Sequence, residues 1–483
     1  MTAFPAINPG QLFIDGGWRP ATSETTIEVT NPATEEVWGT IAQAAPEDID
    51  AALASAQRGL ITWRNTDAWT RSATLRRIAD ILREWGPQAA ALMTAEQGKP
   101  LRESEAEWRA TADQFDWYAD EARRIYGRTV DTHATDTRLF VTREPVGIVA
   151  AFAAWNFPAL LPARKIAPAL AAGCSVIVRP TQEAPFSALL LAAAAHEAGL
   201  PAGVLTMLTG QASQISERLI GSGQVRKVSL TGSVPVGRTL LHLAAENITQ
   251  VSMELGGHAP VLIFPDADIA AAAQQCVATK FRNAGQVCAS PSRFLAHESV
   301  AAEFAAAFVE ATRALRVGHG NDPQVDVGPL TTPSRVEQSE ELIADALAGG
   351  AQVATGGRRA AQFERGYFFE PTVLTDVPIG CRIMRDEPFA PVAPIATFDT
   401  LERAVELANA TDFGLASYVW TRDLHTAFRA SEGIEAGMVG VNSMIVATAE
   451  APFGGVKHSG YGREGGAEGI LDYTVAKATF ITL

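Results

Sequence analysis

Cys288 is the residue in this sequence that is best placed to act as a nucleophile. It ends the segment 281–288 (FRNAGQVC), which follows an expected helix. The glycine and the polar residues of this segment favour a loop thiol over a thiol buried in the core. A cysteine thiolate in such a loop can add to a carbonyl carbon and hold the acyl group as a thioester.

Glu254 and Asn156 are the next candidates, because each follows an expected strand, in MELGG and WNFP respectively. A carboxylate in an apolar stretch has a raised pKa, which suits a general base. Pairing of Glu254 with an arginine or a backbone donor is an equal alternative. The amide of Asn156 could donate to a developing oxyanion, or it could only cap the next turn.

The segment 231–237 (TGSVPVG) lies where an expected strand meets an expected helix. Glycines at such a junction let the phosphates of a coenzyme approach the backbone and the helix N-terminus. The two glycines are separated by four residues and do not form the G-x-G-x-x-G dinucleotide fingerprint. This motif alone is therefore only a weak indication of a coenzyme site.

Short apolar strands alternate with helices around these residues, which indicates an α/β fold with parallel sheets. The strands expected are 146–152, 175–178, 204–208, 225–230 and 251–255, and, in a second α/β region, 261–264, 294–296, 392–398 and 418–420. Such sheets bind ligands beyond the carboxyl ends of their strands, which is where Glu254 and Asn156 are expected to lie.

Local patterns predict three further elements: a hairpin, a helix and a pair of protruding strands. The apolar run 12–14 precedes Asp15-Gly16-Gly17, which predicts a β-hairpin. Apolar spacing and Pro46 predict a helix that begins near residue 46. The strand-like pieces 138–142 and 479–483 have no obvious partner in either sheet, and we predict that they protrude and pair between subunits.

Composition limits the classes of function. The chain has 483 residues, of which 47% are hydrophobic and 19% charged, so a large core and several domains are expected. A formal net charge of -15 argues against nucleic-acid or anionic-membrane partners, which need a positive field. Residues 1–14 lack a signal-peptide pattern and no apolar run reaches membrane-span length, so we expect a cytoplasmic protein.

The four cysteines are too few and too scattered for a disulfide framework. No pair of them has metal-ligand spacing with a nearby histidine, so we predict no metal site. Cys174, Cys276 and Cys381 are predicted to be small buried apolar residues.

Several motifs together resemble the aldehyde dehydrogenase superfamily in order and spacing: WNFP, KIAPALAAGC, LTGSVPVG, MELGG, GQVC, DEPFAP and PFGGVKHSGYGREGG. The resemblance runs from LFIDGGW to the C-terminal strand. It implies a Rossmann-like coenzyme domain (1–124 and 145–256) and an α/β catalytic domain (257–456). It also implies a β-strand oligomerisation arm with a C-terminal segment (125–144 and 457–483), in a homodimer or homotetramer.

The same resemblance implies NAD(P)-dependent oxidation of an aldehyde to a carboxylic acid. Cys288 would be the nucleophile, Glu254 the general base that activates water, and Asn156 an oxyanion donor beside the backbone N–H of Cys288. Lys165 and Glu464 match positions that relay protons, with a structural salt bridge as the alternative.

The resemblance also implies a coenzyme site. Glu387 would hold the nicotinamide ribose and Phe389 would flank the ring. The other residues implied at this site are Trp155, Gly232, Ser233, Gly237, Glu254 and Leu255.

The chain departs from the family pattern at the adenosine ribose. Where Lys-x-x-Glu is common, this sequence has Arg179-Pro180-Thr181-Gln182. Gln182 lacks the negative charge that repels a 2′-phosphate, and Arg179 could pair with that phosphate. Gln182 can still bond a ribose hydroxyl, so we expect NADP or NAD, with a slight preference for NADP.

Two arginines indicate the substrate class. Arg164 and Arg282 match the pair that binds the distal carboxylate in the succinate-semialdehyde and α-ketoglutarate-semialdehyde branch, and structural ion pairs are the alternative. Where that branch often has a serine, this chain has Ala447, with Thr448 beside it. Loss of one hydroxyl contact would cost on the order of 1 kcal/mol or indicate a different acyl chain. We expect succinate semialdehyde or a related dicarboxylic semialdehyde.

Other functions remain open from the sequence. An uncharged aliphatic or aromatic aldehyde would use the same chemistry. A CoA-acylating enzyme would use the same thiol, but Glu254 argues against it because a water-activating base has no role when CoA is the acceptor. A non-catalytic structural descendant is disfavoured by the presence of Cys288, Glu254 and Asn156 together.

Overall fold

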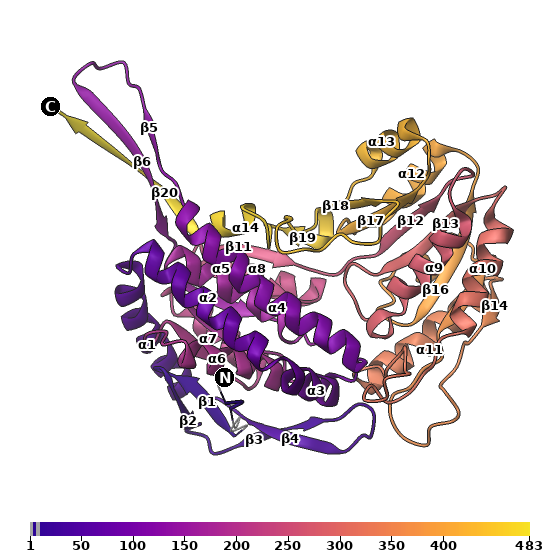
Figure 1. The fold of residues 1–483 in the computed structure, drawn as a ribbon, viewed down its shortest axis with the longest axis horizontal. Coiled ribbons are helices and arrows are strands. Elements are labelled where there is room, and N and C mark those ends of the chain that lie inside the picture. Colours follow the sequence, from indigo (N-terminus) through magenta and orange to yellow (C-terminus); the bar gives the residue numbers. More distant parts are fainter. Residues whose placement is uncertain (1–2, 6–9) are drawn as a thin grey trace.

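The computed structural model describes residues 3–5 and 10–483, which form two α/β units and a projecting arm (Figure 1). Residues 1–2 and 6–9 of the N-terminal segment 1–14 considered above lie outside the described residues. The described helices are each too short or too polar to cross a membrane. The predicted α/β fold class is confirmed.

The first unit is built on an eight-stranded sheet with the order β19-β11-β10-β7-β8-β9-β1-β2. Its strands are β1 (Gln11–Ile14), β2 (Gly17–Pro20), β7 (Ile148–Phe152), β8 (Ser175–Arg179), β9 (Leu205–Met207), β10 (Val225–Thr231), β11 (Gln250–Glu254) and β19 (Gly460–Tyr461). The central strands β7 to β11 run parallel and are buried on both faces, as βαβ units require.

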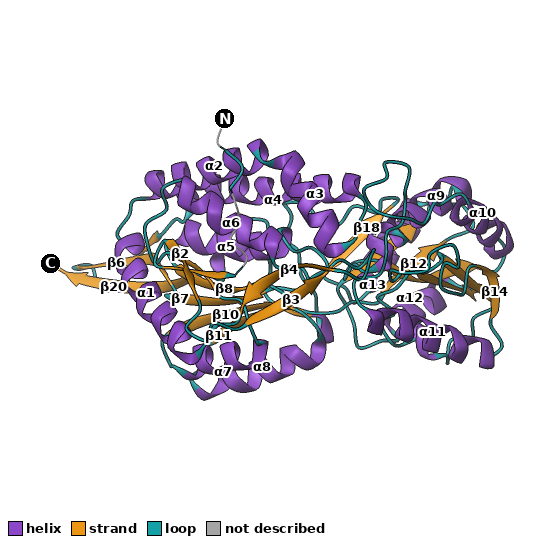
Figure 2. Cartoon of the chain, turned by 90° about the horizontal axis from the view of Figure 1, so that it is seen from below, coloured by secondary structure: helices purple, strands orange, loops and turns teal. Residues whose placement is uncertain are grey.

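Helices cover both faces of this sheet (Figure 2). On one face lie α2 (Ala68–Glu84), α3 (Gly86–Gln97), α4 (Leu101–Glu121), α5 (Leu160–Ala172) and α6 (Phe186–Glu197). On the other lie α1 (Pro46–Arg64), α7 (Ala212–Gly221) and α8 (Val234–Glu246). The helix predicted to begin at Pro46 is confirmed, as is the β1–β2 hairpin, whose turn places Asp15 and Gly16 at positive φ.

The second unit is built on a seven-stranded sheet with the order β14-β15-β16-β13-β12-β17-β18. Its strands are β12 (Ala259–Ile263), β13 (Pro291–His297), β14 (Gln352–Thr355), β15 (Thr372–Thr375), β16 (Val392–Phe398), β17 (Ala416–Trp420) and β18 (Met438–Val441). Its helices are α9 (Ile269–Lys280), α10 (Ala301–Arg313), α11 (Pro333–Ala348), α12 (Leu401–Asn409) and α13 (Leu424–Gly433).

The projecting arm corrects one prediction. The strand-like pieces 138–142 and 479–483 do not lack a partner in their own chain. They belong to β6 (Thr137–Pro145) and β20 (Thr474–Thr482), which pair antiparallel with each other along their whole length, and β5 (Arg128–Val130) completes the sheet. Their separation in sequence, 345 residues between Thr137 and Thr482, hid this pairing.

The sequence patterns did not predict the small sheet of β3 (Thr26–Thr30) and β4 (Val37–Ala42), or the short helix α14 (Glu468–Leu471). α14 packs on α5, and β19 pairs with β11. The segment that follows the second unit therefore returns to the first unit and lies beside the strand that carries Glu254.

Candidate active site

Cys288 lies between two cavities that meet at its side chain. One cavity, of about 150 Å³, is lined by the ends of β10 and β11 together with Trp155, Glu387 and Phe389. The other, of about 360 Å³, is lined by α5, α9 and the loop after β18. Cys288 contributes to both linings, so a reactant in either cavity has access to the same thiol.

The loop before Cys288 is held in an unusual backbone conformation. Asn283 and Ala284 have φ values of 50° and 52°, which are rare for residues other than glycine. Gln97 donates to the Asn283 side chain at 2.9 Å and so helps to fix this turn. A side chain at Gly285 would collide with the carbonyl oxygen of Ala390, so the turn needs glycine there.

The thiol of Cys288 is poorly ionised in this environment. Burial, together with the neighbouring Glu387 and Glu254, raises its pKa to about 12, and Arg164 opposes this rise. A reactive thiolate therefore needs a base or an added positive charge nearby. The oxidised nicotinamide ring of a bound coenzyme would supply such a charge.

Asn156, the predicted oxyanion donor, is held by the loop that carries Cys288. Its side-chain Nδ2 donates to the carbonyl oxygen of Gln286 at 3.1 Å, and the residue lines the cavity beside Cys288. Its own carbonyl oxygen accepts from Lys99 at 2.7 Å and from the Asn283 side chain at 2.9 Å. These contacts tie the WNFP turn to the cysteine loop.

Glu254 has the environment of a general base. The residue is buried, and neither carboxylate oxygen has a hydrogen-bond partner among the described residues. Burial raises its pKa well above the ordinary value, and the nearby Glu464 raises it further while Lys165 and Arg164 lower it. The alternative in which Glu254 pairs with an arginine or a backbone donor is not what the structure contains.

Lys165 and Glu464 form a fully buried ion pair next to the base. The ammonium of Lys165 also donates to the hydroxyl of Thr231 at 2.6 Å. The pair is therefore both a structural salt bridge and a set of groups that can exchange protons close to Glu254.

The cavity on the β10–β11 side brings together six of the residues predicted to hold a coenzyme, whereas Arg179, Gln182, Gly237 and Glu254 are not in its lining. Trp155, Gly232, Ser233, Leu255, Glu387 and Phe389 all line it. Ser233 begins α8, whose first N–H groups suit an anionic phosphate. A side chain at Gly256 would collide with Glu387, and one at Gly237 with Leu255, so both glycines permit the close packing here.

Glu387 is a buried carboxylate, and one of its oxygens accepts a hydrogen bond from the backbone. Its Oε1 accepts the backbone N–H of Gly257 at 3.0 Å, and burial raises its pKa to about 7. A ribose hydroxyl that donates to this carboxylate would satisfy it. The residues present thus fit a nicotinamide coenzyme, with the reactive ring near Cys288 and Phe389.

Arg179 and Gln182, the two residues predicted near the adenosine ribose, differ in their contacts and exposure. Arg179 already donates from Nε and Nη2 to the carbonyl oxygen of Gly210, at 3.3 and 3.0 Å. Gln182 is partly exposed at the end of the same segment. The neighbouring Glu183 accepts a hydrogen bond from Thr181 and favours the charged form of Arg179.

The larger cavity contains Arg164 and Arg282, the predicted pair. Arg164 is 5% exposed, its Nε has no hydrogen-bond partner, and its guanidinium lies 4.3 Å over the ring of Phe453. Arg282 lies 5.0 Å over the ring of Phe157. Each cation thus contacts an aromatic face, and neither forms an ion pair with a described carboxylate.

The loop after β18 lines this cavity together with residues of α5. Its residues 443–447 line the cavity, Ala447 included, whereas Thr448 is not among the lining residues. The position where the semialdehyde branch often has a serine therefore faces the cavity without a hydroxyl.

Sequence reasoning missed two residues at these cavities. Lys99 is fully buried between the carboxylate of Glu107 and the carbonyl oxygen of Asn156. Arg335, near the start of α11, lines the coenzyme-side cavity with Glu387. Neither belongs to a local motif with a recognisable chemistry, because their partners are far away in the sequence.

Comparison with known proteins agrees with this geometry. Residues 18–479 match the model of the aldehyde dehydrogenase family. The chain is 45% identical to a 3-sulfolactaldehyde dehydrogenase from Pseudomonas putida, over 98% of this chain and 97% of that one. It is 43% identical to the NADP-dependent succinate-semialdehyde dehydrogenase GabD of Escherichia coli K12, over 98% of each chain.

Solved structures give the same result. An NADP-dependent enzyme from E. coli superposes with a TM-score of 0.97 at 42% identity, covering 98% of both chains. The chain therefore belongs to the aldehyde dehydrogenase family, as its fold and its cysteine between two cavities indicate. It is an oxidoreductase that uses NAD or NADP to oxidise a small aldehyde.

Proposed function

We propose that this protein oxidises a short aldehyde with an anionic group at its far end, with succinate semialdehyde as the leading substrate. The observation that carries this proposal is the pair of arginines without counter-ions in the cavity that reaches Cys288. Arg164 is buried, and a buried cation without a partner is costly, so a substrate carboxylate would remove that cost at Arg164 on binding. Arg282 is exposed to solvent and adds a second positive charge to the same cavity.

The proposed reaction has three steps: addition of the thiolate to the aldehyde, hydride transfer, and hydrolysis of the thioester. The thiolate adds to the aldehyde carbon, while the amide of Asn156 stabilises the oxyanion. The bound coenzyme supplies the hydride acceptor. Glu254 then takes a proton from a water molecule that attacks the thioester, which releases the carboxylic acid and restores Cys288.

A sulfonated aldehyde is the second candidate substrate. The relative at 45% identity carries the name of a 3-sulfolactaldehyde dehydrogenase. Two guanidinium groups can share the oxygens of a sulfonate as well as those of a carboxylate. Ala447 also supplies no hydroxyl at the position where the semialdehyde branch often has a serine.

For the coenzyme we propose a preference for NADP. Gln182 places no negative charge where a 2′-phosphate would lie, and the E. coli relative is named as an NADP enzyme. Arg179 donates to Gly210 through Nε and Nη2, and its third nitrogen, Nη1, takes no part in that contact. In this proposal 1–124 and 145–256 bind the coenzyme, 257–456 carry the thiol, and 457–483 complete the first unit and the arm.

We also propose that the protein is a cytoplasmic homodimer or homotetramer assembled through its arm. The strands of the arm expose large apolar side chains, among them Phe140, Phe480 and Ile481. Exposed apolar groups on a projecting sheet favour association with a second copy. The net charge of -15 supports neither nucleic acid nor an anionic membrane as partner.

Steady-state kinetics without CoA test the substrate proposal. Succinate semialdehyde, 3-sulfolactaldehyde and butanal would each be measured with NADP and NAD. Arg282→Ala should lower kcat/KM for the anionic aldehydes roughly 30-fold or more and leave butanal nearly unchanged. Arg164→Ala should lower kcat/KM for the anionic aldehydes by at least as much, with a smaller loss for butanal because Arg164 also lowers the pKa of Cys288. Arg313→Ala, at an exposed position on α10, is the matched control. Equal losses for charged and uncharged aldehydes would contradict the proposal.

A further inference from the structure

The larger cavity beside Cys288 extends along α9 beyond its two arginines. Its lining includes Gln275, Ala278 and Thr279 of that helix, and Arg282 just after the helix ends. The C-terminal end of α9 leads into the loop of Cys288, so residues earlier in the helix lie further from that end. Arg282 follows Gln275 by seven positions, which corresponds to about 10 Å along a helix axis. The cavity therefore offers space past Arg282 on the side away from the thiol.

The two arginines lie at different depths in this cavity. Arg164 is 5% exposed and lowers the pKa of both Cys288 and Glu254, so its charge acts at the reacting end. Arg282 is exposed to solvent and lies over the ring of Phe157. The cavity thus provides an inner and an outer position for the anionic group of a substrate.

Gln275 adds a hydrogen-bond donor at the outer part of the cavity. Its side chain is exposed and forms no hydrogen bond with another described residue. An amide of this kind has two N–H groups to donate. The hydroxyl of Thr279, which lies between Gln275 and Arg282 on the cavity wall, already donates to the carbonyl oxygen of Gln275 at 2.9 Å. The donors left for an anion at this end are therefore the Gln275 amide and the Arg282 guanidinium.

Most of the remaining cavity wall is apolar. Leu160, Val287, Met444 and Ile445 all belong to the lining, and Ile445 is 75% exposed. Methylene groups pack favourably against such side chains, whereas a charged group gains nothing from them. A longer substrate would therefore lay its methylenes on this wall and place its anion at the polar groups of α9.

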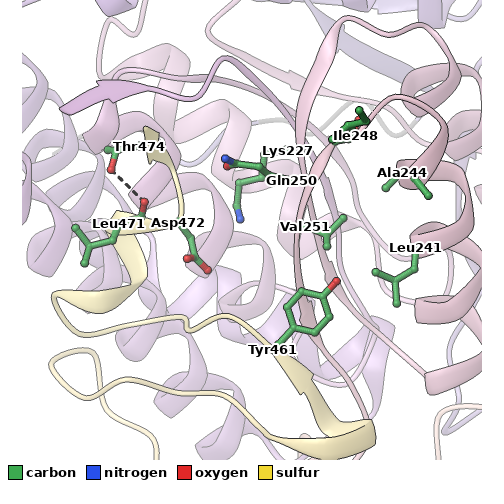
Figure 3. Close-up of a pocket in the computed structure, with 12 residues that line it drawn as sticks. Lys227, Leu241, Ala244, Ile248, Gln250, Val251, Tyr461, Leu471, Asp472 and Thr474 are labelled. Carbon is green, nitrogen blue, oxygen red and sulfur yellow. Dashed lines mark hydrogen bonds between the residues drawn. The ribbon is translucent and has the colours of Figure 1, made fainter. Parts of the chain in front are cut away.

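A cavity of about 690 Å³ offers no alternative path for a long substrate. It lies between α8 and the C-terminal segment, with Leu241 and Val251 on one side and Leu471 and Asp472 on the other (Figure 3). Cys288 is not in its lining, so a chain bound there could not present its aldehyde to the thiol.

We propose that Gln275 is a specificity-determining residue that lets the enzyme take anionic aldehydes longer than succinate semialdehyde. Its amide and the Arg282 guanidinium hold the carboxylate of a five- or six-carbon unbranched semialdehyde at the outer position. Arg164 holds the carboxylate of the four-carbon substrate at the inner position. The inference rests on the proposed function, because it takes anionic aldehydes as the substrates.

Steady-state kinetics with the four-, five- and six-carbon semialdehydes test this inference on the full-length enzyme. Hexanal has the length of the six-carbon semialdehyde without its charge. In Gln275→Ala, kcat/KM for the six-carbon relative to the four-carbon semialdehyde should fall roughly fivefold, mainly through KM. In Gln275→Glu the fall should be roughly 30-fold or more, because a carboxylate there repels the substrate anion. The loss should grow with each added methylene, and hexanal should not share it.

Gln274→Ala is the matched control, because Gln274 is the neighbouring residue of α9, is exposed and is not in the cavity lining. It should leave the six- to four-carbon ratio unchanged, and thermal unfolding shows that each variant is folded. An unchanged ratio in both Gln275 variants would overturn the inference, as would an equal loss for hexanal.

Two outcomes with the unaltered protein separate this inference from the proposed function. Oxidation of the four-carbon semialdehyde but of neither longer homologue would overturn the inference and leave the proposed function standing. No preference for semialdehydes over uncharged aldehydes of equal length would overturn the proposed function, and the inference with it.

Discussion

The ammonium of Lys99 donates to the backbone carbonyl oxygen of Asn156 at 2.7 Å, although the two residues are 57 positions apart in the sequence. Lys99 also donates to the carboxylate of Glu107, and both side chains are fully buried. The other oxygen of Glu107 accepts the backbone N–H of Ala159 at 3.0 Å. One buried ion pair thus fixes both ends of the turn that presents the oxyanion donor.

Lys99→Met should therefore impair both folding and catalysis. Removal of one partner leaves the Glu107 carboxylate buried without a counter-ion, which costs about 3–5 kcal/mol of unfolding free energy. Thermal unfolding measures that loss, and kcat should fall as Asn156 becomes less well positioned. Lys477→Met, which removes an exposed pair with Glu144, should change stability by less than about 1 kcal/mol. Equal stability of the two variants would contradict the argument.

Cys288→Ala should abolish aldehyde oxidation. The nucleophile has no substitute nearby, because Cys174, Cys276 and Cys381 are all buried. Loss of a nucleophile typically costs about 10⁴-fold or more in kcat. Hydrolysis of an activated ester should be lost together with it, whereas coenzyme binding by titration should persist. Residual oxidation at more than about a hundredth of the original rate would exclude Cys288 as the nucleophile.

Glu254→Gln should separate the two halves of the reaction. Glu254 is the base that we propose activates water, so thioester hydrolysis should slow by about 10²–10⁴-fold while one equivalent of reduced coenzyme still forms rapidly. In the unaltered protein, burial raises the pKa of Glu254, and only the ionised form is a base. The hydrolytic rate should therefore rise with pH through that raised pKa. Loss of the rapid first turnover in Glu254→Gln would assign the residue to an earlier step.

The positions of Glu254 and Asn156 are predictable from the sequence because both residues sit at strand ends. Glu254 closes β11, Asn156 follows β7, and parallel strands bring their carboxyl ends to one edge. The pairing of β6 with β20 and the role of Lys99 were not predictable in this way. Both depend on contacts between distant segments, for which a single sequence carries no local periodicity. The burial of Glu254 beside Lys165 and Glu464 likewise needed the tertiary structure.

Gln182→Glu should reverse the coenzyme preference. A carboxylate at position 182 can accept from both hydroxyls of an adenosine ribose and repels a 2′-phosphate. The ratio of kcat/KM with NADP to that with NAD should fall by roughly tenfold or more, because one charge–charge contact of this kind costs about 1–3 kcal/mol. Dissociation constants for the two coenzymes, measured without aldehyde, should shift in the same direction.

Glu183→Gln is the control, since Glu183 already bears a negative charge next to Arg179. If Glu183→Gln raises affinity for NADP while Gln182→Glu leaves the ratio unchanged, then Glu183, not Gln182, sets the preference. That result would move the determinant by one residue along the segment that follows Arg179, which is held by its bond to Gly210.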